Sequence, residues 1–260
     1  MWVSMTDDSK LRRVVVRKTA TVGGLRISYR EERDPRPEQE PLLLIHGLGM
    51  SSAAFAELAP RLTEDFHILA IDLPGCGHSQ TPPRAYGVPE MVDGIIAWLD
   101  QIGVDRVNLL GHSLGGQIVV RLAARYPERV RKAVVVSCPP DPAAPRAWQA
   151  ALRLASDALM EPTQVIRQAT FDYLRSTPRL MWQTWKKALR TGVEDAAHSV
   201  NAPTLVVRGT WDPVVTGPGA RELSNLIPNS GLVEIERGTH GLPLQSPEKL
   251  AAAAVKFLKS

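Results

Sequence analysis

Residues 107–116 read VNLLGHSLGG, and this stretch decides the fold. The apolar run from Val107 to Leu110 is typical of a buried strand, and Leu114 to Tyr126 has the pattern of a helix that stops at Pro127. Ser113 therefore stands on a tight turn between strand and helix. Such a turn strains the serine backbone and projects its hydroxyl above the sheet, while the flanking glycines let neighbouring backbone pass closely. The setting predicts a nucleophilic serine rather than one that only caps a helix.

On both sides of this turn, short apolar runs alternate with amphipathic segments. An antiparallel pair is expected first, from Val14–Val16 and Leu25–Tyr29, joined by a turn at Gly23–Gly24. Polar residues 31–40 form a surface connection. Further strands are expected at 41–46, 67–72, 107–110, 133–137, 204–208 and 232–235, with helices at 52–62, 91–102, 114–126 and 246–258. The alternation predicts an α/β fold, a mainly parallel sheet with helices on both faces.

Residues 139–199 interrupt the alternation and read as helices with no convincing strand. We therefore expect a helical cap inserted into a core built from residues 1–138 and 200–260. Most large apolar side chains of the cap should pack among its helices and against the core. Its basic residues should form a solvated face, although one of them could bind a substrate carboxylate. Three tryptophans are candidates for substrate binding: Trp148, Trp182 and Trp185.

Four short motifs each stand at the end of a predicted strand. They are His46-Gly47-Leu48-Gly49, the stretch Asp72–Ser79, the stretch Gly111–Gly116, and Gly209-Thr210-Trp211-Asp212, with His240 near the end of the sequence. In this order the motifs resemble those of the α/β-hydrolase fold family, in its serine esterase and lipase branch with a helical cap. The resemblance runs from about residue 24 to the end of the chain and implies an eight-stranded sheet.

The resemblance implies a catalytic triad of Ser113, Asp212 and His240, in the chain order nucleophile, acid, base. A serine hydroxyl is a poor nucleophile at neutral pH. An imidazole must therefore take its proton, and a carboxylate must hold that imidazole in the right tautomer. Asp141 is the alternative acid, because some relatives place the acid after the strand at 133–137.

The resemblance also assigns the oxyanion hole to the backbone N–H groups of Leu48 and Leu114, which would stabilise the tetrahedral oxyanion. Leu114 starts a helix, whose dipole favours negative charge at that end. One position departs from the family pattern: glycine often precedes the catalytic histidine directly, whereas Thr239 stands between Gly238 and His240 here.

The composition limits the alternatives. The chain of 260 residues is 44% hydrophobic and 22% charged, which is ordinary for a globular protein. The net charge is +4, but Lys and Arg are dispersed among acidic residues, so we expect no nucleic-acid partner. Cys76 and Cys138 lack metal-ligand spacing and are too few for a disulfide framework, so both should be small packed residues. We expect no metal and no cofactor.

The sequence opens without a signal-peptide pattern, and no segment has the length of a membrane span. We therefore expect a cytoplasmic protein that does not bind membranes. A small molecule is the expected partner, and the chain is expected to be a monomer or a homodimer.

The expected reaction is hydrolysis of a carboxylic ester, thioester or lactone with an apolar or aromatic portion, through an acyl-enzyme on Ser113. Carbon–carbon bond hydrolases of this fold are an alternative, but they often carry a tryptophan after the base, where Gly241 and Leu242 stand here. A lyase or cyclase of a biosynthetic pathway stays open, as does a receptor-like protein with slow or no turnover. Epoxide and haloalkane chemistry in this fold uses an aspartate nucleophile, so Ser113 argues against both.

Overall fold

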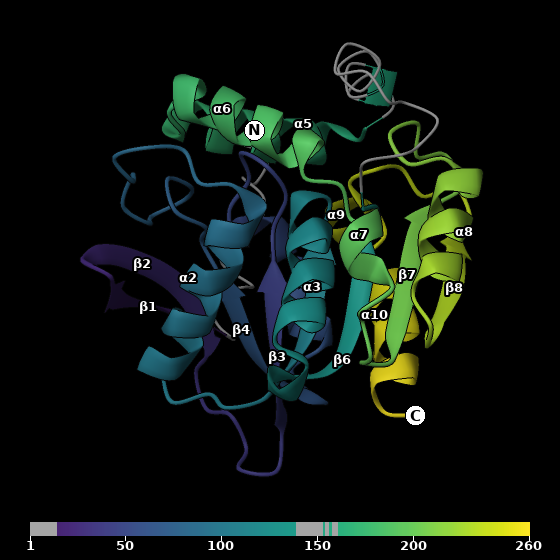
Figure 1. Ribbon diagram of the computed structural model, residues 1–260, viewed down its shortest axis with the longest axis horizontal. Coiled ribbons are helices and arrows are strands. Elements are labelled where there is room, and N and C mark those ends of the chain that lie inside the picture. Colours follow the sequence, from purple (N-terminus) through teal and green to yellow (C-terminus); the bar gives the residue numbers. More distant parts are fainter. Residues whose placement is uncertain (1–14, 139–152, 154–155, 158–160) are drawn as a thin grey trace, which may run out of the picture.

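The computed structural model describes residues 15–138, 153, 156–157 and 161–260. Its eight strands form one sheet in the order β1-β2-β4-β3-β5-β6-β7-β8 (Figure 1). β1 (Val15–Val22) pairs antiparallel with β2 (Leu25–Glu32), and β2 pairs antiparallel with β4 (Phe66–Ile71). The other strand pairs are parallel and involve β3 (Glu40–Ile45), β5 (Val107–His112), β6 (Val130–Val136), β7 (Thr204–Gly209) and β8 (Ser230–Ile235). The predicted eight-stranded, mainly parallel α/β fold is confirmed.

Helices cover both faces of this sheet. One face carries α2 (Val88–Gln101), α3 (Leu114–Arg125), α7 (Glu194–Ala197) and α8 (Gly217–Leu226). The other carries α10 (Pro247–Leu258) and two short 3₁₀ turns, η1 (Ser52–Phe55) and η2 (Ala59–Arg61). A third 3₁₀ turn, η3 (Pro127–Arg129), follows α3 at Pro127.

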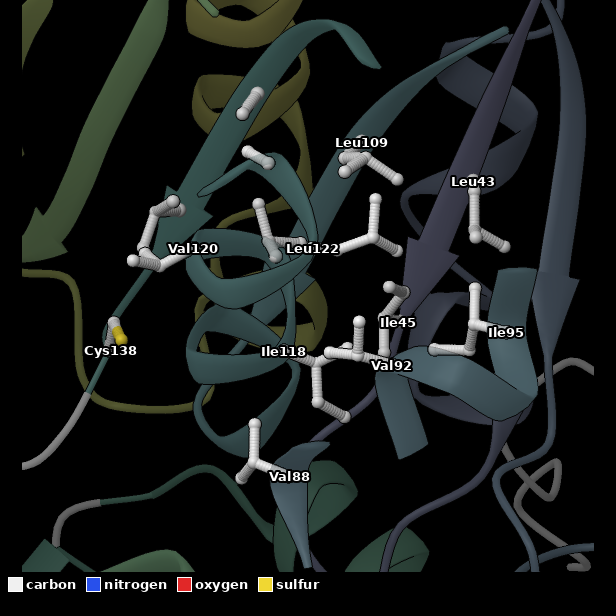
Figure 2. Packing of buried hydrophobic residues seen from close by; sticks show 14 of the residues in the cluster. Leu43, Ile45, Val88, Val92, Ile95, Leu109, Ile118, Val120, Leu122 and Cys138 are labelled. Carbon is white, nitrogen blue, oxygen red and sulfur yellow. The ribbon is translucent and has the colours of Figure 1, made fainter. Parts of the chain in front are cut away.

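Alternate residues of the central strands serve the two hydrophobic cores, as the strand period of two requires. Leu43 and Ile45 of β3 belong to the cluster under α2 and α3, whereas Leu42 and Leu44 belong to the cluster on the opposite face. Figure 2 shows the first cluster, in which Ile118 and Leu122 of α3 lie beside β3 and β5. The central strands are therefore buried on both faces, which fixes the carboxyl ends of β3 and β5 next to each other.

The expected helix at 52–62 is wrong in type, because the chain forms the separate turns η1 and η2 there. Pro60 lies in η2, near the end of this segment, and proline lacks the N–H that a continuous α-helix needs. The apolar side chains that suggested a helix, Phe55, Leu58 and Leu62, are nevertheless buried.

The described part of the cap contains α5 (Thr163–Arg175) and α6 (Pro178–Arg190), which lie across one end of the sheet (Figure 1). The hydroxyl of Ser51, in the loop after β3, donates to the Asp172 carboxylate of α5 at 3.0 Å. α7 falls within the range expected for the cap but contacts α3 and α8 of the core. The exact extent of the cap stays a prediction. Among the described residues, no helix is both long and apolar enough to cross a lipid bilayer.

Candidate active site

Ser113 lies between the end of β5 and the start of α3, with φ 55° and ψ −117°. A positive φ is costly for a residue with a Cβ, so the surrounding chain must hold this conformation. Glycine is required on both sides of the turn. A Cβ on Gly111 would lie 2.2 Å from the carbonyl oxygen of Gly115, and a Cβ on Gly115 would lie 2.1 Å from that of Ile45. The predicted strand, tight turn and helix are thus present, with the serine at the apex.

His240 lies between Ser113 and Asp212. Its Nε2 is 3.1 Å from Ser113 Oγ, and its Nδ1 is 3.0 Å from Asp212 Oδ2. Both His240 and Asp212 are buried. This geometry places the proton on Nδ1, leaving Nε2 to accept the proton of the serine hydroxyl. The structure therefore brings together the three side chains that the sequence assigned to a triad.

The loops that carry Asp212 and His240 touch through their backbones. A Cβ on Gly209 would lie 2.1 Å from the carbonyl oxygen of Gly238. That same carbonyl accepts the N–H of Trp211 at 2.9 Å. Because the two loops follow the neighbouring strands β7 and β8, this contact holds the acid beside the histidine. The alternative acid, Asp141, lies outside the described residues.

Burial and charge act in opposite directions on the titration of this pair. Burial disfavours the imidazolium of His240, but the adjacent Asp212 carboxylate outweighs it and raises the His240 pKa above its ordinary value. Burial likewise opposes ionisation of Asp212, and the interaction with His240 outweighs it, so the pKa of Asp212 is lowered. The pair thus favours an ionised acid beside a histidine that readily accepts a proton.

The loop after β3 lies against Ser113. A Cβ on Gly47 would be 3.2 Å from the Cβ of Ser113. The Gly47 carbonyl accepts bonds from His46 Nδ1 at 2.7 Å and from the Met50 N–H at 3.2 Å. In a trans peptide the C=O and the following N–H point in opposite directions, so the Leu48 N–H faces away from these two donors.

Leu48 and Leu114 both line the cavity in front of Ser113. The Leu114 N–H belongs to the first turn of α3, where backbone donors have no partner within the helix. The structure thus places both predicted oxyanion-hole residues beside Ser113, and their role as donors stays a prediction.

His112 supports the loop that carries His240. Its Nε2 lies 2.8 Å from the carbonyl oxygen of His240, to which it donates. Burial lowers the His112 pKa to about 3, so this imidazole is neutral over the ordinary pH range. His112 is therefore a positioning residue for the loop that carries His240.

The cysteines have no role in this chemistry. Both Cys76 and Cys138 are free thiols. Burial raises the pKa of Cys76 to about 12 and also raises that of Cys138, which keeps both protonated and poorly nucleophilic.

A cavity of about 350 Å³ opens in front of Ser113 and His240. Its walls are mostly apolar and include Met50, Val165, Leu189, Val214 and Leu244. Trp185 of α6 is also part of the lining, as the sequence suggested. Trp182 is not: its side chain is 54% exposed, and it packs on Trp185 with ring centroids 4.8 Å apart. Trp148 lies outside the described residues.

Two buried carboxylates of the cap, Asp157 and Glu161, also line the cavity, and the sequence analysis missed them. Asp157 Oδ1 accepts the backbone N–H of His240 at 3.2 Å. Glu161 accepts the Gly241 N–H at 2.6 Å and the Thr239 hydroxyl at 2.9 Å. Thr239, the departure from the family pattern, is therefore a partner of the cap. The available signal was the four-residue spacing of the two acids, which places them on one face of a helix.

Comparison with known proteins gives several relatives that are hydrolases. A family model described as the alpha/beta hydrolase fold matches residues 40–161. Poly(3-hydroxyalkanoate) depolymerase of Ectopseudomonas oleovorans is 29% identical over 251 residues, which cover 87% of each chain. (E)-2-((N-methylformamido)methylene)succinate hydrolase of Acinetobacter baylyi is 25% identical over 252 residues, 86% of this chain and 92% of that protein.

Among solved structures, the enol-lactonase from Burkholderia xenovorans superposes with a TM-score of 0.82, covering 94% of this chain and 100% of that one. The two sequences are 23% identical, so this likeness shows the fold alone. Motifs, sheet order and relatives agree that this chain has the α/β-hydrolase fold and is a hydrolase.

Proposed function

We propose that this hydrolase cleaves a carboxylic ester, thioester or lactone with an apolar or aromatic portion, through an acyl-enzyme on Ser113. The observation that carries the proposal is the position of His240, 3.1 Å from Ser113 Oγ and 3.0 Å from Asp212 Oδ2. This relay supplies the base that a serine hydroxyl needs and the acid that a leaving alkoxide, phenolate or thiolate needs.

The reaction proceeds in two halves. In the first, His240 Nε2 takes the hydroxyl proton while Ser113 Oγ bonds to the carbonyl carbon. The tetrahedral intermediate then collapses, and His240 returns the proton to the leaving group. In the second half, His240 deprotonates a water molecule, which attacks the acyl-enzyme, and the acid is released as Ser113 regains its proton. Asp212 stays ionised throughout and stabilises the imidazolium.

Charge that develops on the carbonyl oxygen needs donors already in place. The N–H groups of Leu48 and Leu114 are the proposed donors, supported by the position of the Gly47–Leu48 peptide against Ser113. Removing one such donor typically costs about 10²–10³ in kcat in serine hydrolases. Because backbone groups supply both, no side-chain deletion removes them directly.

The cavity walls support the proposed substrate class. They are largely apolar and include the indole of Trp185, which suits an alkyl or aryl portion better than a sugar or a peptide backbone. The relatives named above include a poly(3-hydroxyalkanoate) depolymerase, whose name denotes a substrate with ester linkages.

The proposal is tested with p-nitrophenyl butyrate. We expect steady-state release of p-nitrophenol by the wild-type protein and none above background by Ser113→Ala. The function would be refuted by a folded wild-type protein that neither turns over this ester nor reacts with a fluorophosphonate at Ser113.

A further inference from the structure

The cavity contains a pair of acidic side chains that the triad chemistry does not use. Asp157 and Glu161 are 7% and 9% exposed, and both belong to the cavity lining. The N–H of Glu161 donates to the carbonyl of Asp157 at 3.0 Å, so the two residues stand one helical turn apart on the same side of the cap. They therefore present two carboxyl groups to the substrate space next to His240.

Among the described residues, no permanent cation lines the cavity beside this pair. No lysine or arginine belongs to the cavity lining in the described part of the chain, and His240 is the group there that can become cationic. Two other buried carboxylates have different surroundings. Asp212 is bonded to His240, and Asp72 accepts two backbone N–H groups, from Ser52 at 2.7 Å and His78 at 3.0 Å.

Burial and mutual repulsion raise the pKa values of the pair. Burial first, and then the charge of Asp157, raise the pKa of Glu161 to about 7. Burial also raises the pKa of Asp157. Such a pair titrates as a unit and holds one proton more readily than two separate acids, yet it keeps negative charge near neutral pH.

The pair also keeps hydrogen-bonding capacity. A carboxylate has about four lone-pair sites on two oxygens. The loop around His240 accounts for one bond to Asp157 and two bonds to Glu161. A hydrogen bond also joins the two carboxyl groups to each other. The acceptor sites that remain belong to two residues that line a cavity with otherwise mostly apolar walls, where electrostatic interactions are weakly screened.

We propose that Asp157 and Glu161 form a charge-selecting subsite, which favours substrates with an ammonium group and disfavours substrates with a carboxylate. The proposal rests on the proposed ester hydrolysis and names its substrate class more closely. The proposed preference differs from what the name of one relative indicates. That relative is named as the hydrolase of a substituted succinate, and a succinate carries two carboxyl groups. The sequence analysis left open that a basic residue of the cap binds a substrate carboxylate. The described lining of the cavity contains no lysine or arginine that could do so.

A purely structural role for the pair makes a different prediction. If the two carboxylates only anchored the cap to the loop of His240, their removal would slow all substrates by a similar factor. A charge-selecting subsite instead changes the ratio of rates between substrates of opposite charge. The ratio within one variant is therefore the informative quantity, because a general loss of activity cancels from it.

The test uses three p-nitrophenyl esters whose acyl chains have equal length and end in trimethylammonium, tert-butyl or carboxylate. The first two groups have nearly the same shape, so they differ mainly in charge. For the wild-type protein we expect kcat/KM for the ammonium ester to exceed that for the carboxylate ester at least tenfold. In the double variant Asp157→Asn, Glu161→Gln, the kcat/KM values for these two esters should differ by no more than about threefold.

A second double variant, Asp195→Asn with Glu222→Gln, removes the same formal charge from exposed positions outside the cavity. It should keep the wild-type ratio. A wild-type ratio near one, or a ratio that survives in the cavity variant, overturns the subsite.

A binding measurement separates the subsite from the proposed function. If the tert-butyl ester is not hydrolysed at all, ester hydrolysis fails, and the subsite is then judged on Ser113→Ala. We expect calorimetry to show hexyltrimethylammonium binding to Ser113→Ala at least tenfold more tightly than hexanoate, with the difference lost when Asp157→Asn and Glu161→Gln are added. Equal binding of the two ligands overturns the subsite independently of catalysis.

Discussion

The two oxygens of Asp212 have different partners: Oδ2 lies 3.0 Å from His240 Nδ1, whereas Oδ1 accepts the backbone N–H groups of Val214 and Val215 at 2.8 and 3.0 Å. The carboxylate cannot rotate without losing both backbone bonds. Its orientation, and through it the tautomer and tilt of the His240 ring, are therefore fixed before substrate arrives. One oxygen of Asp212 thus holds the side chain to the backbone, while the other orients His240 for the proposed reaction.

Asp212→Asn should keep the fold and lose most of the activity. An asparagine fills the same space but does not stabilise the imidazolium and favours the wrong tautomer, so we expect kcat to fall by about 10⁴. Asp141→Asn, at the alternative acid, should leave kcat within about twofold of wild type. Steady-state assays with p-nitrophenyl butyrate check both variants. A fully active Asp212→Asn protein beside an inactive Asp141→Asn protein would reverse the assignment of the acid.

The acidic limb of the pH profile should respond to the cap carboxylates. The base works only when neutral, so kcat/KM for a neutral ester rises with pH as His240 loses its proton. The carboxylates that face His240 are Asp212, Asp157 and Glu161, and all three raise its pKa, while His112 beside it is neutral. Asp157→Asn with Glu161→Gln should lower the His240 pKa and move this limb to lower pH.

Asp195→Asn serves as the control for this shift, because that exposed carboxylate pairs with Arg121 away from the cavity. The acidic limb of the pH profile of Asp195→Asn should coincide with that of the wild-type protein. A limb that stays in place, or that moves to higher pH, in the cavity variant would show that the cap acids do not act on His240.

Gly115→Ala should be far more harmful than the same change in another helix. The new Cβ would lie 2.1 Å from the carbonyl oxygen of Ile45, so β3 and α3 must separate and Ser113 must move. We expect the free energy of unfolding to fall by about 1–3 kcal/mol or more, with loss of activity. Gly94, on the exposed side of α2, has no atom within 4 Å of a built Cβ. Gly94→Ala should therefore stabilise the protein by about 0.5–1 kcal/mol, as urea unfolding of the two variants can show.

The two tryptophans of α6 should differ in their effect on substrate binding. Trp185 lines the cavity, whereas Trp182 packs on its outer side and is mostly exposed. With p-nitrophenyl octanoate, Trp185→Ala should lower kcat/KM by about tenfold through loss of apolar contact, and Trp182→Ala by no more than about twofold. Equal losses in both variants would indicate that Trp182 also reaches the substrate.

The sequence predicted the parts of the site that depend on local chain geometry. Ser113 was predictable because the strand before it and the helix after it are contiguous with it, and because Gly111 and Gly115 are sterically required. Asp212 and His240 came from resemblance to a family motif, and the parallel pairing of the neighbouring strands β7 and β8 explains why they meet.

The remainder depends on contacts that no local pattern encodes. Asp157 and Glu161 meet residues about eighty positions further along the chain. Their helical spacing alone would also fit a solvated face. The helix expected at 52–62 failed for a local reason, since Pro60 outweighs the apolar periodicity around it. The packing of Trp182 outside the cavity depends on how α6 is rotated over the core, which the spacing of aromatic residues does not determine.

The central claim, that Ser113 is a nucleophile activated by His240, is tested most directly by trapping the acyl-enzyme. The wild-type protein is mixed with p-nitrophenyl butyrate, quenched in acid within the burst of p-nitrophenol, and digested for mass spectrometry. We expect one butyryl group on the peptide that contains Ser113, and none in Ser113→Ala or His240→Ala. A butyryl group on another residue, or release of p-nitrophenol by Ser113→Ala at the wild-type rate, would contradict the account.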